Sequence, residues 1–163
     1  MLNNKVQEAI NNQIKNELFS AYIYLAMSAY FEDQNLPGMA GWMRMQSNEE
    51  MEHAMKFYDY IYDRGGRVSL QAIDQPPFQW ESPLAAFEQA YAHEQKVTGM
   101  INGIYKIAEE ENDYPTQVML HWFIDEQVEE EKSASAIVEQ LKMVGEHTGP
   151  LLMLDHQLGQ RAD

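Results

Sequence analysis

Carboxylates and one histidine recur in the two halves of the chain at matching intervals. The recurring positions are Glu17, Glu50 and His53 in the first half, and Glu94, Gln127 and Glu130 in the second. In each half the second residue follows the first by 33 positions and the third comes three later, and the halves are offset by 77. Oxygen donors with one imidazole and no sulfur suit iron, manganese or zinc. The spacing therefore predicts a metal site.

Each of the four glutamates falls on the apolar face of a predicted helix. Residues three, four and seven positions apart share one face of a helix, so a glutamate within such a stripe points toward the core. The apolar partners are Ile10 and Ile14 for Glu17, Ala54 and Phe57 for Glu50, Phe87 and Ile101 for Glu94, and Phe123 and Ala134 for Glu130. Four carboxylates are therefore predicted to face one interior.

The elements that must position these residues are four long helices and a short fifth one. Glycines, prolines and capping residues mark the ends of the helices. The predicted spans run from Asn3 or Asn4 to about Glu32, from Pro37 to Gly65, from Ser82-Pro83 to about Asn112-Asp113, from Tyr114-Pro115 to Gly145, and onward from Gly149-Pro150. About 28 residues make a helix of roughly 42 Å. We expect an all-α four-helix bundle, with residues 1–163 as one domain.

The connections between the predicted helices set their directions. Short turns near residues 34 and 113 join antiparallel neighbours. The connection from Gly65 to Ser82 is long enough to span roughly 60 Å, and we interpret it as a crossover strap rather than a lid over the site. Such a strap favours parallel second and third helices. Its apolar residues, expected to pack on the bundle, are Val68, Leu70, Ile73, Phe78 and Trp80.

The turn positions also predict the height of the polar residues along the bundle. In an antiparallel hairpin, residues equally far from the turn lie side by side. Glu17 and Glu50 are centred on the first turn, and Glu94 and Gln127 are centred on the second. The inward polar groups should therefore form one layer in the middle of the bundle.

Such a layer poses an electrostatic problem, because burying even one unpaired carboxylate costs several kcal/mol. No interior lysine or arginine is evident, and the nearest basic residue, Arg44, has another helix face available. Two divalent cations would cancel the charge of four carboxylates. Hard carboxylate ligands also stabilise the trivalent state of a metal. We therefore favour iron, reacting with oxygen or peroxide, over manganese or zinc. A glutamate from each of two helices, with a Glu-x-x-His motif from each of the other two, is the ligand pattern of ferritin-like carboxylate proteins and serves here as the template.

Composition excludes several other classes of protein. The 163 residues include 26 acidic and 11 basic side chains, a formal charge of −15, and no cysteine. Disulfide frameworks, thiolate metal sites and cysteine nucleophiles are excluded, and the acidity argues against nucleic-acid binding. The longest uncharged run, residues 18–31, is shorter than the about 20 residues of a membrane span. With no signal sequence evident, we expect a cytoplasmic protein.

Over essentially its whole length the sequence resembles the haem-free bacterial ferritins. The segments that carry the resemblance are Asn16-Glu17-Leu18 with Tyr24, residues 48–53 (NEEMEH), Glu94, and residues 122–132 (WFIDEQVEEEK). The resemblance implies a homo-oligomeric shell of 24 subunits that oxidises Fe(II) with dioxygen or peroxide and stores the ferric mineral inside.

The resemblance also implies roles for individual residues. The first iron would be held by Glu17, Glu50 and His53, and the second by Glu50, Glu94 and Glu130, with Glu50 bridging. Gln127 would be a polar neighbour, and Tyr24 and Trp122 would be aromatic residues able to supply an electron. A third iron site would be formed by Glu49, Glu126, Glu129 and Glu130.

No haem is expected. Haem-carrying relatives have a second Glu-x-x-His motif where this chain has Gln127 and Glu130, and haem-free ferritins also tolerate a methionine at the position of Met51.

Other interpretations stay open at this stage. A rubrerythrin-like peroxidase or di-iron oxidase would use the same bundle, but its cysteine-rich iron domain and an evident substrate pocket are missing. A DNA-protecting mini-ferritin would need a basic tail and an intersubunit site, and a metal-free bundle would leave the acids unpaired. By spacing alone, Glu49, Glu126 and Glu129 would be surface residues, and Tyr24 could be core packing. The apolar last helix, residues 151–158, is expected to pack between subunits.

Overall fold

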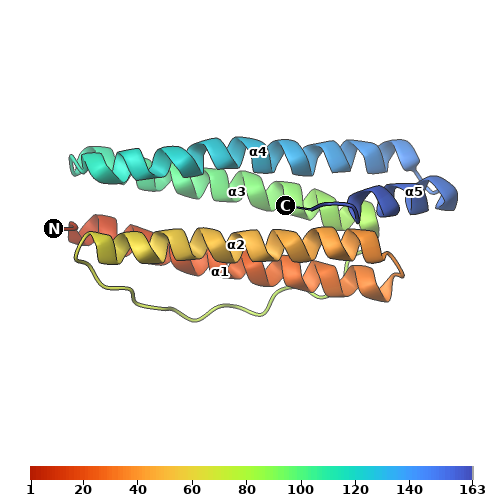
Figure 1. Ribbon diagram of the computed structural model, residues 1–163, viewed down its shortest axis with the longest axis horizontal. Helices are drawn as coiled ribbons and strands as arrows, with labels where there is room; N and C mark the ends of the chain where they lie inside the picture. The colour runs from red at the N-terminus through yellow and green to blue at the C-terminus, as the bar shows by residue number, and fades with distance from the viewer. Residues whose placement is uncertain (163) are drawn as a thin grey trace.

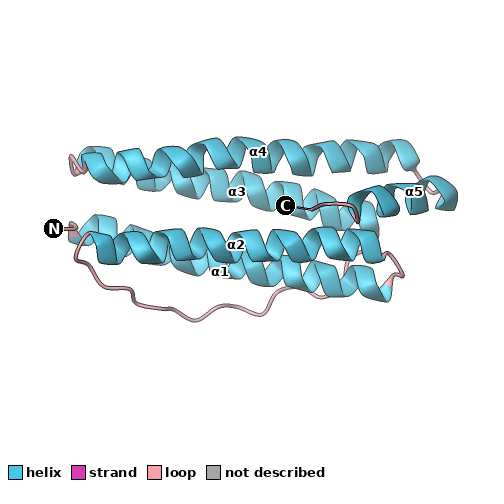
Figure 2. Ribbon diagram, in the orientation of Figure 1, coloured by secondary structure: helices cyan, strands magenta, loops and turns pink. Residues whose placement is uncertain are grey.

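The computed structural model describes residues 1–162 and is an α-helical bundle, as predicted (Figures 1 and 2). Its helices are α1 (Asn4–Asp33), α2 (Pro37–Asp63), α3 (Pro83–Glu110), α4 (Tyr114–Val144) and α5 (Thr148–Leu158). No strand occurs in the described residues. None of these helices has both the length and the apolar character needed to cross a bilayer.

Side chains at the helix ends explain why the boundaries follow the sequence signals. The Asn3 side chain accepts hydrogen bonds from two backbone N–H groups of the first turn of α1, and Ser82 accepts one from Ala85. Gly145 ends α4 with a positive φ of 60°. The third helix ends slightly earlier than predicted, at Glu110, because Asn112 adopts a left-handed conformation with φ of 53°.

The helices form two antiparallel hairpins, α1–α2 and α3–α4, joined by the predicted strap (Figure 1). The strap runs the length of the bundle, so α2 and α3 are parallel, as its length indicated. Asn11 of α1 holds the start of the strap. Its Nδ2 atom donates to the Arg67 carbonyl at 3.0 Å, and its Oδ1 atom accepts from the Ser69 N–H at 2.8 Å.

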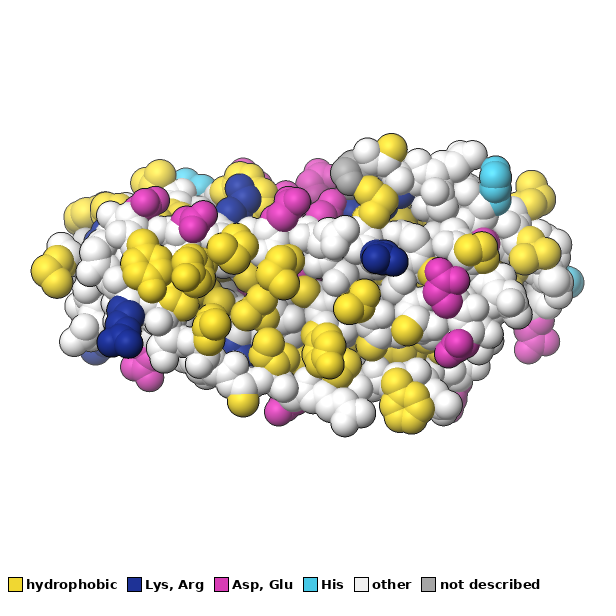
Figure 3. Space-filling model, turned by 60° about the horizontal axis from the view of Figure 1, so that its bottom comes forward, with side chains coloured by type: hydrophobic (Ala, Val, Ile, Leu, Met, Phe, Trp, Pro, Cys, Tyr) yellow, Lys and Arg dark blue, Asp and Glu magenta, His cyan; other side chains and the backbone are white. Residues whose placement is uncertain are grey.

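The expected packing of the strap is only partly correct. Val68 and Trp80 pack against the bundle, but Leu70 and Phe78 are each 68% exposed and Ile73 is 37% exposed. An extended segment turns alternate side chains away from the surface it follows, so it cannot bury them all within one chain. Hydrophobic side chains gather on this side of the molecule (Figure 3).

A polar layer divides the apolar core into two clusters. One cluster contains the C-terminal half of α1 and the N-terminal half of α2, including Phe31 and Met39. The other contains the opposite ends of these helices, including Ile10 and Phe57. Between the clusters lie buried Glu17, Gln46, Glu50, His53, Glu94, Gln127 and Glu130. The two clusters therefore hold the polar layer from both sides.

Helix α5 packs first within its own chain, which the sequence interpretation did not anticipate. Leu154 and Leu158 are buried against the end of the bundle, whereas Leu152 and Met153 are 51% and 75% exposed. An amphipathic helix of 11 residues can bury one face on its own chain and leave the other available. Only this second face is free to pack between subunits.

Asp155 of α5 caps the N-terminus of α2. Its carboxylate accepts hydrogen bonds from the backbone N–H groups of Gly38 at 3.1 Å and Met39 at 2.7 Å. The residue before the helix, Leu36, makes no side-chain cap. A Cβ atom at Gly38 would overlap the Asp155 carbonyl, so the glycine permits this close approach. Asp155 therefore links the last helix to α2.

Asp155→Ala should lower the free energy of unfolding by about 1–2 kcal/mol, because two N–H groups at the start of α2 lose their acceptor. Asp155→Asn should retain part of this stability. Denaturant unfolding of both variants gives the measurement, with His156→Ala at the exposed neighbouring position as the matched control. Equal stability of the wild type and Asp155→Ala would contradict the capping role.

Candidate metal centre

The polar residues predicted to face inward do meet in one mid-bundle layer. Glu17, Glu50 and Glu94 are each 1% exposed, His53 is 4% exposed and Glu130 is 6% exposed. They come from all four long helices, and the 33-residue spacing places them at the same height. The packing of two hairpins therefore gathers residues that are far apart in the sequence.

Two sets of ligand atoms in this layer are close enough to hold a metal ion. One set is Glu17, Glu50 and His53, and the other is Glu50, Glu94 and Glu130. Within each set, one ligand atom from every residue lies within 4.8 Å of the others. Glu50 belongs to both sets, so its carboxylate can bridge two ions. A further set joins His53 and Glu130 to Glu126.

Tyr24 and Gln127 hold the carboxylate of Glu94 in place. The Tyr24 hydroxyl donates a hydrogen bond to Glu94 Oε1, although the ring also packs in the apolar cluster. Gln127 Nε2 donates to Glu94 Oε2 at 3.2 Å and to the Glu94 carbonyl at 3.1 Å. Both residues thus contact a candidate ligand, which favours the site role of Tyr24 over packing alone.

Two further glutamines support the carboxylates, and the sequence interpretation missed both roles. Gln13 Nε2 donates to Glu17 Oε1 at 2.9 Å. Gln46 Nε2 donates to Glu130 Oε2 at 2.6 Å and to Glu50 Oε1 at 3.3 Å. Each glutamine stands one helical turn before a site glutamate, and the two are themselves 33 residues apart. This spacing, the same as between Glu17 and Glu50, could have predicted from the sequence that both glutamines lie beside the site.

Burial and mutual repulsion raise the pKa of three carboxylates of this layer, Glu50, Glu94 and Glu130. Burial, followed by the charges of Glu94 and Glu17, raises the pKa of Glu50 well above its usual value. Burial also raises the pKa of Glu94 to about 7 and that of Glu130 to about 9. Desolvation lowers the pKa of His53, which favours the neutral imidazole that a metal needs.

One carboxylate oxygen in the layer lacks a partner. The Oε2 atom of Glu17 is buried and accepts no hydrogen bond from any described residue. A buried acceptor without a partner costs about 1–3 kcal/mol or more when it is charged. Together with the oxygen-rich donor set, this atom shows that the residues present fit a bound cation.

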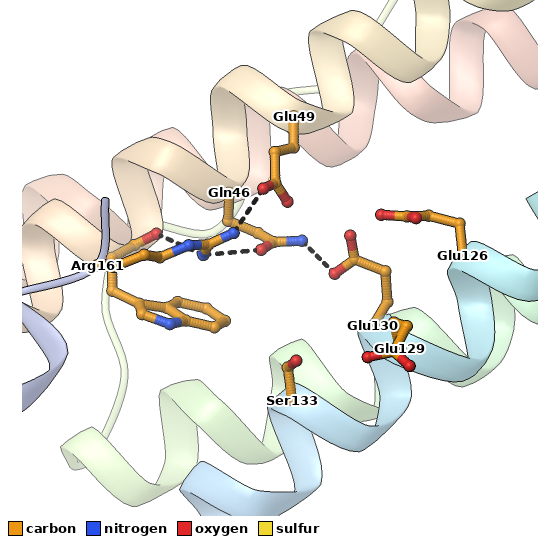
Figure 4. Close-up of a pocket in the computed structure, with 8 residues that line it drawn as sticks. Gln46, Glu49, Glu126, Glu129, Glu130, Ser133 and Arg161 are labelled. Carbon is orange, nitrogen blue, oxygen red and sulfur yellow. Dashed lines mark hydrogen bonds and ion pairs between the residues drawn. The ribbon is translucent and has the colours of Figure 1, made fainter. Parts of the chain in front are cut away.

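Beside this layer, a pocket of about 390 Å³ contains the residues expected to form a third site (Figure 4). Its lining includes Glu49, Glu126, Glu129 and Glu130. Glu126 Oε1 lies 3.8 Å from His53 Nε2. Glu129 is exposed and is absent from the close sets of ligand atoms found in the described residues. The four glutamates thus border one pocket, and their binding of a third ion stays a prediction.

A basic residue that the sequence interpretation did not consider reaches the edge of this pocket. Arg161, near the C-terminus, places Nη2 2.8 Å from Glu49 Oε1, whereas Arg44 is exposed. No periodic pattern predicts where a residue after the last helix will lie, so only the docking of α5 reveals this contact. Arg161 makes no described ion pair with Glu17, Glu50, Glu94 or Glu130.

Trp122 and Met51, two further residues considered in the sequence, are both partly exposed. Trp122 is 41% exposed and packs edge-on against His53, with ring centroids 5.4 Å apart. Met51 is 47% exposed on α2.

A four-helix bundle whose buried carboxylates and histidine form two overlapping ligand sets defines a di-metal carboxylate protein. The ferritin-like domain family matches residues 7–144. The chain belongs to the ferritin family, a family of iron-storage proteins.

Known relatives cover nearly all of the chain. A bacterial non-heme ferritin of Bacteroides fragilis is 44% identical over 161 residues, covering 99% of this chain and 100% of the relative. One from Staphylococcus haemolyticus is 36% identical, covering 99% and 98%. An open-pore ferritin from the hyperthermophilic archaeon Archaeoglobus fulgidus is 48% identical, with 99% of both chains covered and a TM-score of 0.98. The predicted resemblance and the bundle fold are thus confirmed.

The metal-free protein should lose stability as pH rises from about 5 to 9. The folded-state pKa values of Glu94 and Glu130, about 7 and about 9, exceed the unfolded value, so the folded state binds more protons in this interval. Below about pH 4.5 this contribution is fully present, and it is lost as pH passes the folded pKa values. Denaturant unfolding in the presence of a chelator measures the trend.

Glu130→Gln removes one of these protonation equilibria and should flatten the pH dependence. Saturating Zn²⁺ should reverse the decline in the wild type, because metal binds the ionised carboxylates. Stability that stayed constant or rose with pH in the chelated wild type would refute this electrostatic account.

Proposed function

We propose that the protein oxidises Fe(II) at a paired site within each subunit and stores the Fe(III) product inside a homo-oligomeric shell. The observation that carries this proposal is the pair of ligand sets sharing Glu50 in the bundle interior. Four carboxylates match the charge of two ferrous ions, and among the described residues no buried lysine or arginine forms an ion pair with them.

We assign the first iron to Glu17, Glu50 and His53, and the second to Glu50, Glu94 and Glu130. Support comes from the proximity of the ligand atoms and from the neutral state favoured for His53. Hydrogen bonds from Gln13, Gln46, Gln127 and Tyr24 orient the carboxylates before iron enters. Such supporting bonds tune metal affinity.

The chemistry proposed for the pair balances in electrons. Two ferrous ions give up two electrons, which reduce dioxygen to hydrogen peroxide or hydrogen peroxide to water when two protons are supplied. Glu94 and Glu130, with raised pKa values, are groups that release protons when ferrous iron binds. Tyr24, hydrogen-bonded to Glu94, and Trp122, packed on His53, are each positioned to supply one electron. With the two electrons from iron and four protons, these would complete the reduction of dioxygen to two water molecules.

The proposed assembly has support in the surface of the subunit. Large hydrophobic side chains are exposed on three neighbouring elements, among them Tyr22 and Leu25 of α1, Met55 of α2 and Phe78 of the strap. Figure 3 shows hydrophobic side chains gathered on the strap side. Contiguous exposed apolar surface is typical of a protein interface. We therefore propose self-assembly, with 24 subunits as the number implied by the resemblance, in the cytoplasm.

The competing functions predict different products. A rubrerythrin-like peroxidase or di-iron oxidase would turn over at the paired site without accumulating mineral, and a DNA-protecting mini-ferritin would have its iron site between subunits. The ligand sets here come from a single chain. Adding Fe(II) anaerobically, admitting oxygen, and recording ferric absorbance with particle mass separates storage in a large shell from turnover in a small oligomer.

Glu50→Gln should reduce the rate of Fe(II) oxidation by about 100-fold or more, because both ions lose a shared ligand. At a pH high enough to ionise Glu50, the same variant should be more stable than the wild type without metal, because it lacks that buried charge. Ferric absorbance after mixing with oxygen measures the rate, and Glu88→Gln, at an exposed position of α3, is the control. A wild-type rate in Glu50→Gln would refute the assignment.

A further inference from the structure

The pocket beside the paired site already contains a cationic group of the protein itself. Arg161 enters its edge from the C-terminal segment and meets the wall formed by α2 (Figure 4). We propose that Arg161 is a tethered cation that competes with a metal ion for Glu49, so that the C-terminal segment sets the affinity of this pocket. The inference rests on the proposed function, because the pocket adjoins the proposed second iron through Glu130.

The guanidinium group of Arg161 is held by several contacts at once. Its Nη2 atom lies 2.8 Å from Glu49 Oε1, and its Nη1 atom donates to Gln46 Oε1 at 3.1 Å and to the Trp42 carbonyl at 3.3 Å. It also lies over the Trp42 ring, 4.7 Å from the centroid. The Arg161 side chain is 15% exposed and that of Glu49 is 26% exposed. The Arg161–Glu49 ion pair is thus largely shielded from solvent.

The fold brings Arg161 to this position through a short tether. Asp155 and Leu158 anchor α5 to the end of the bundle, and only Gly159 and Gln160 separate the helix from Arg161. A Cβ atom at Gly159 would lie 2.9 Å from Gly38 Cα, so this glycine permits close contact with α2. The arginine side chain can therefore leave Glu49 while α5 stays docked.

The Arg161 guanidinium and a divalent metal ion cannot both bind the Glu49 carboxylate, because both are positively charged. Glu126, Glu129 and Glu130 face the same space from α4, so a divalent ion entering it would be attracted by three carboxylates besides Glu49. To use Glu49 as a ligand, the ion must take the carboxylate from the guanidinium, and two neighbouring cations repel each other. Metal affinity here is therefore reduced by the strength of the Arg161–Glu49 pair.

Arg161 also acts on the paired site through Gln46. Because Gln46 Oε1 accepts from Arg161, the amide nitrogen of Gln46 is directed toward Glu130 and Glu50, at 2.6 Å and 3.3 Å. Reversal of this amide would place an oxygen against two carboxylates. Arg161 is thus a positioning residue for Gln46 as well as a competitor at Glu49.

Anaerobic calorimetric titration of the assembled protein with Fe(II) tests the competition without requiring turnover. Arg161→Ala should bind iron in the pocket about fivefold more tightly, the effect of a pair worth about 1 kcal/mol. The two tight sites per chain should remain in number but bind iron more weakly, because Gln46 loses the contact that orients its amide. Arg161→Lys should fall between the two proteins. Arg44→Ala, which removes an exposed charge from α2, is the matched control and should leave the pocket unchanged.

A double-mutant cycle separates direct competition from a general loss of positive charge. In the Glu49→Gln background, Arg161→Ala should no longer raise the affinity for the third ion, because the shared carboxylate is gone. Absence of the two tight sites in the wild type would overturn the proposed function. Two tight sites with the same third-ion binding in wild type and Arg161→Ala would overturn only the role of Arg161, as would an equal gain in Arg44→Ala.

Discussion

Mutual repulsion among carboxylates enclosed in the middle of the bundle is the constraint on which the rest of the structure depends. Glu17, Glu50, Glu94 and Glu130 are buried together, and raised pKa values at Glu50, Glu94 and Glu130 express the cost of ionising them there. Such a layer persists because the apolar clusters on either side pack the four helices tightly. The apolar ends of the bundle thus stabilise the fold, and the middle holds carboxylates close enough to bind cations.

Glutamine side chains orient the buried carboxylates of the mid-bundle layer. Gln13, Gln46 and Gln127 each donate a hydrogen bond to a site carboxylate, which orients the oxygen atoms and reduces repulsion without introducing a competing charge. A lysine or arginine in the same places would neutralise the acids permanently and compete with iron. Neutral donors leave the net negative charge that attracts metal, and they fix the geometry that receives it.

The C-terminal segment connects the end of the chain to the site. Asp155 caps α2, and six residues further on Arg161 meets Glu49 and Gln46 of the same helix. Helix α2 therefore carries Glu50, which is shared by the two candidate ligand sets, His53, and the contacts of the tail. The C-terminal segment and the candidate metal centre thus share α2, so a displacement of α5 would also move the contacts of Arg161 with Glu49 and Gln46.

Periodicity and the 33-residue spacing were sufficient to predict the four-helix bundle and the meeting of Glu17, Glu50, His53, Glu94 and Glu130, and the length of the strap favoured parallel second and third helices. These features follow from local rules, because the face of a helix and the height in a hairpin depend only on distance along the chain. Docking of α5 on its own chain, the exposure of Leu70, Ile73 and Phe78 on the strap, and the contact of Arg161 with Glu49 required the tertiary structure. No local pattern encodes which surface an extended segment or a terminal residue meets, since that is decided by the packing of elements distant in sequence.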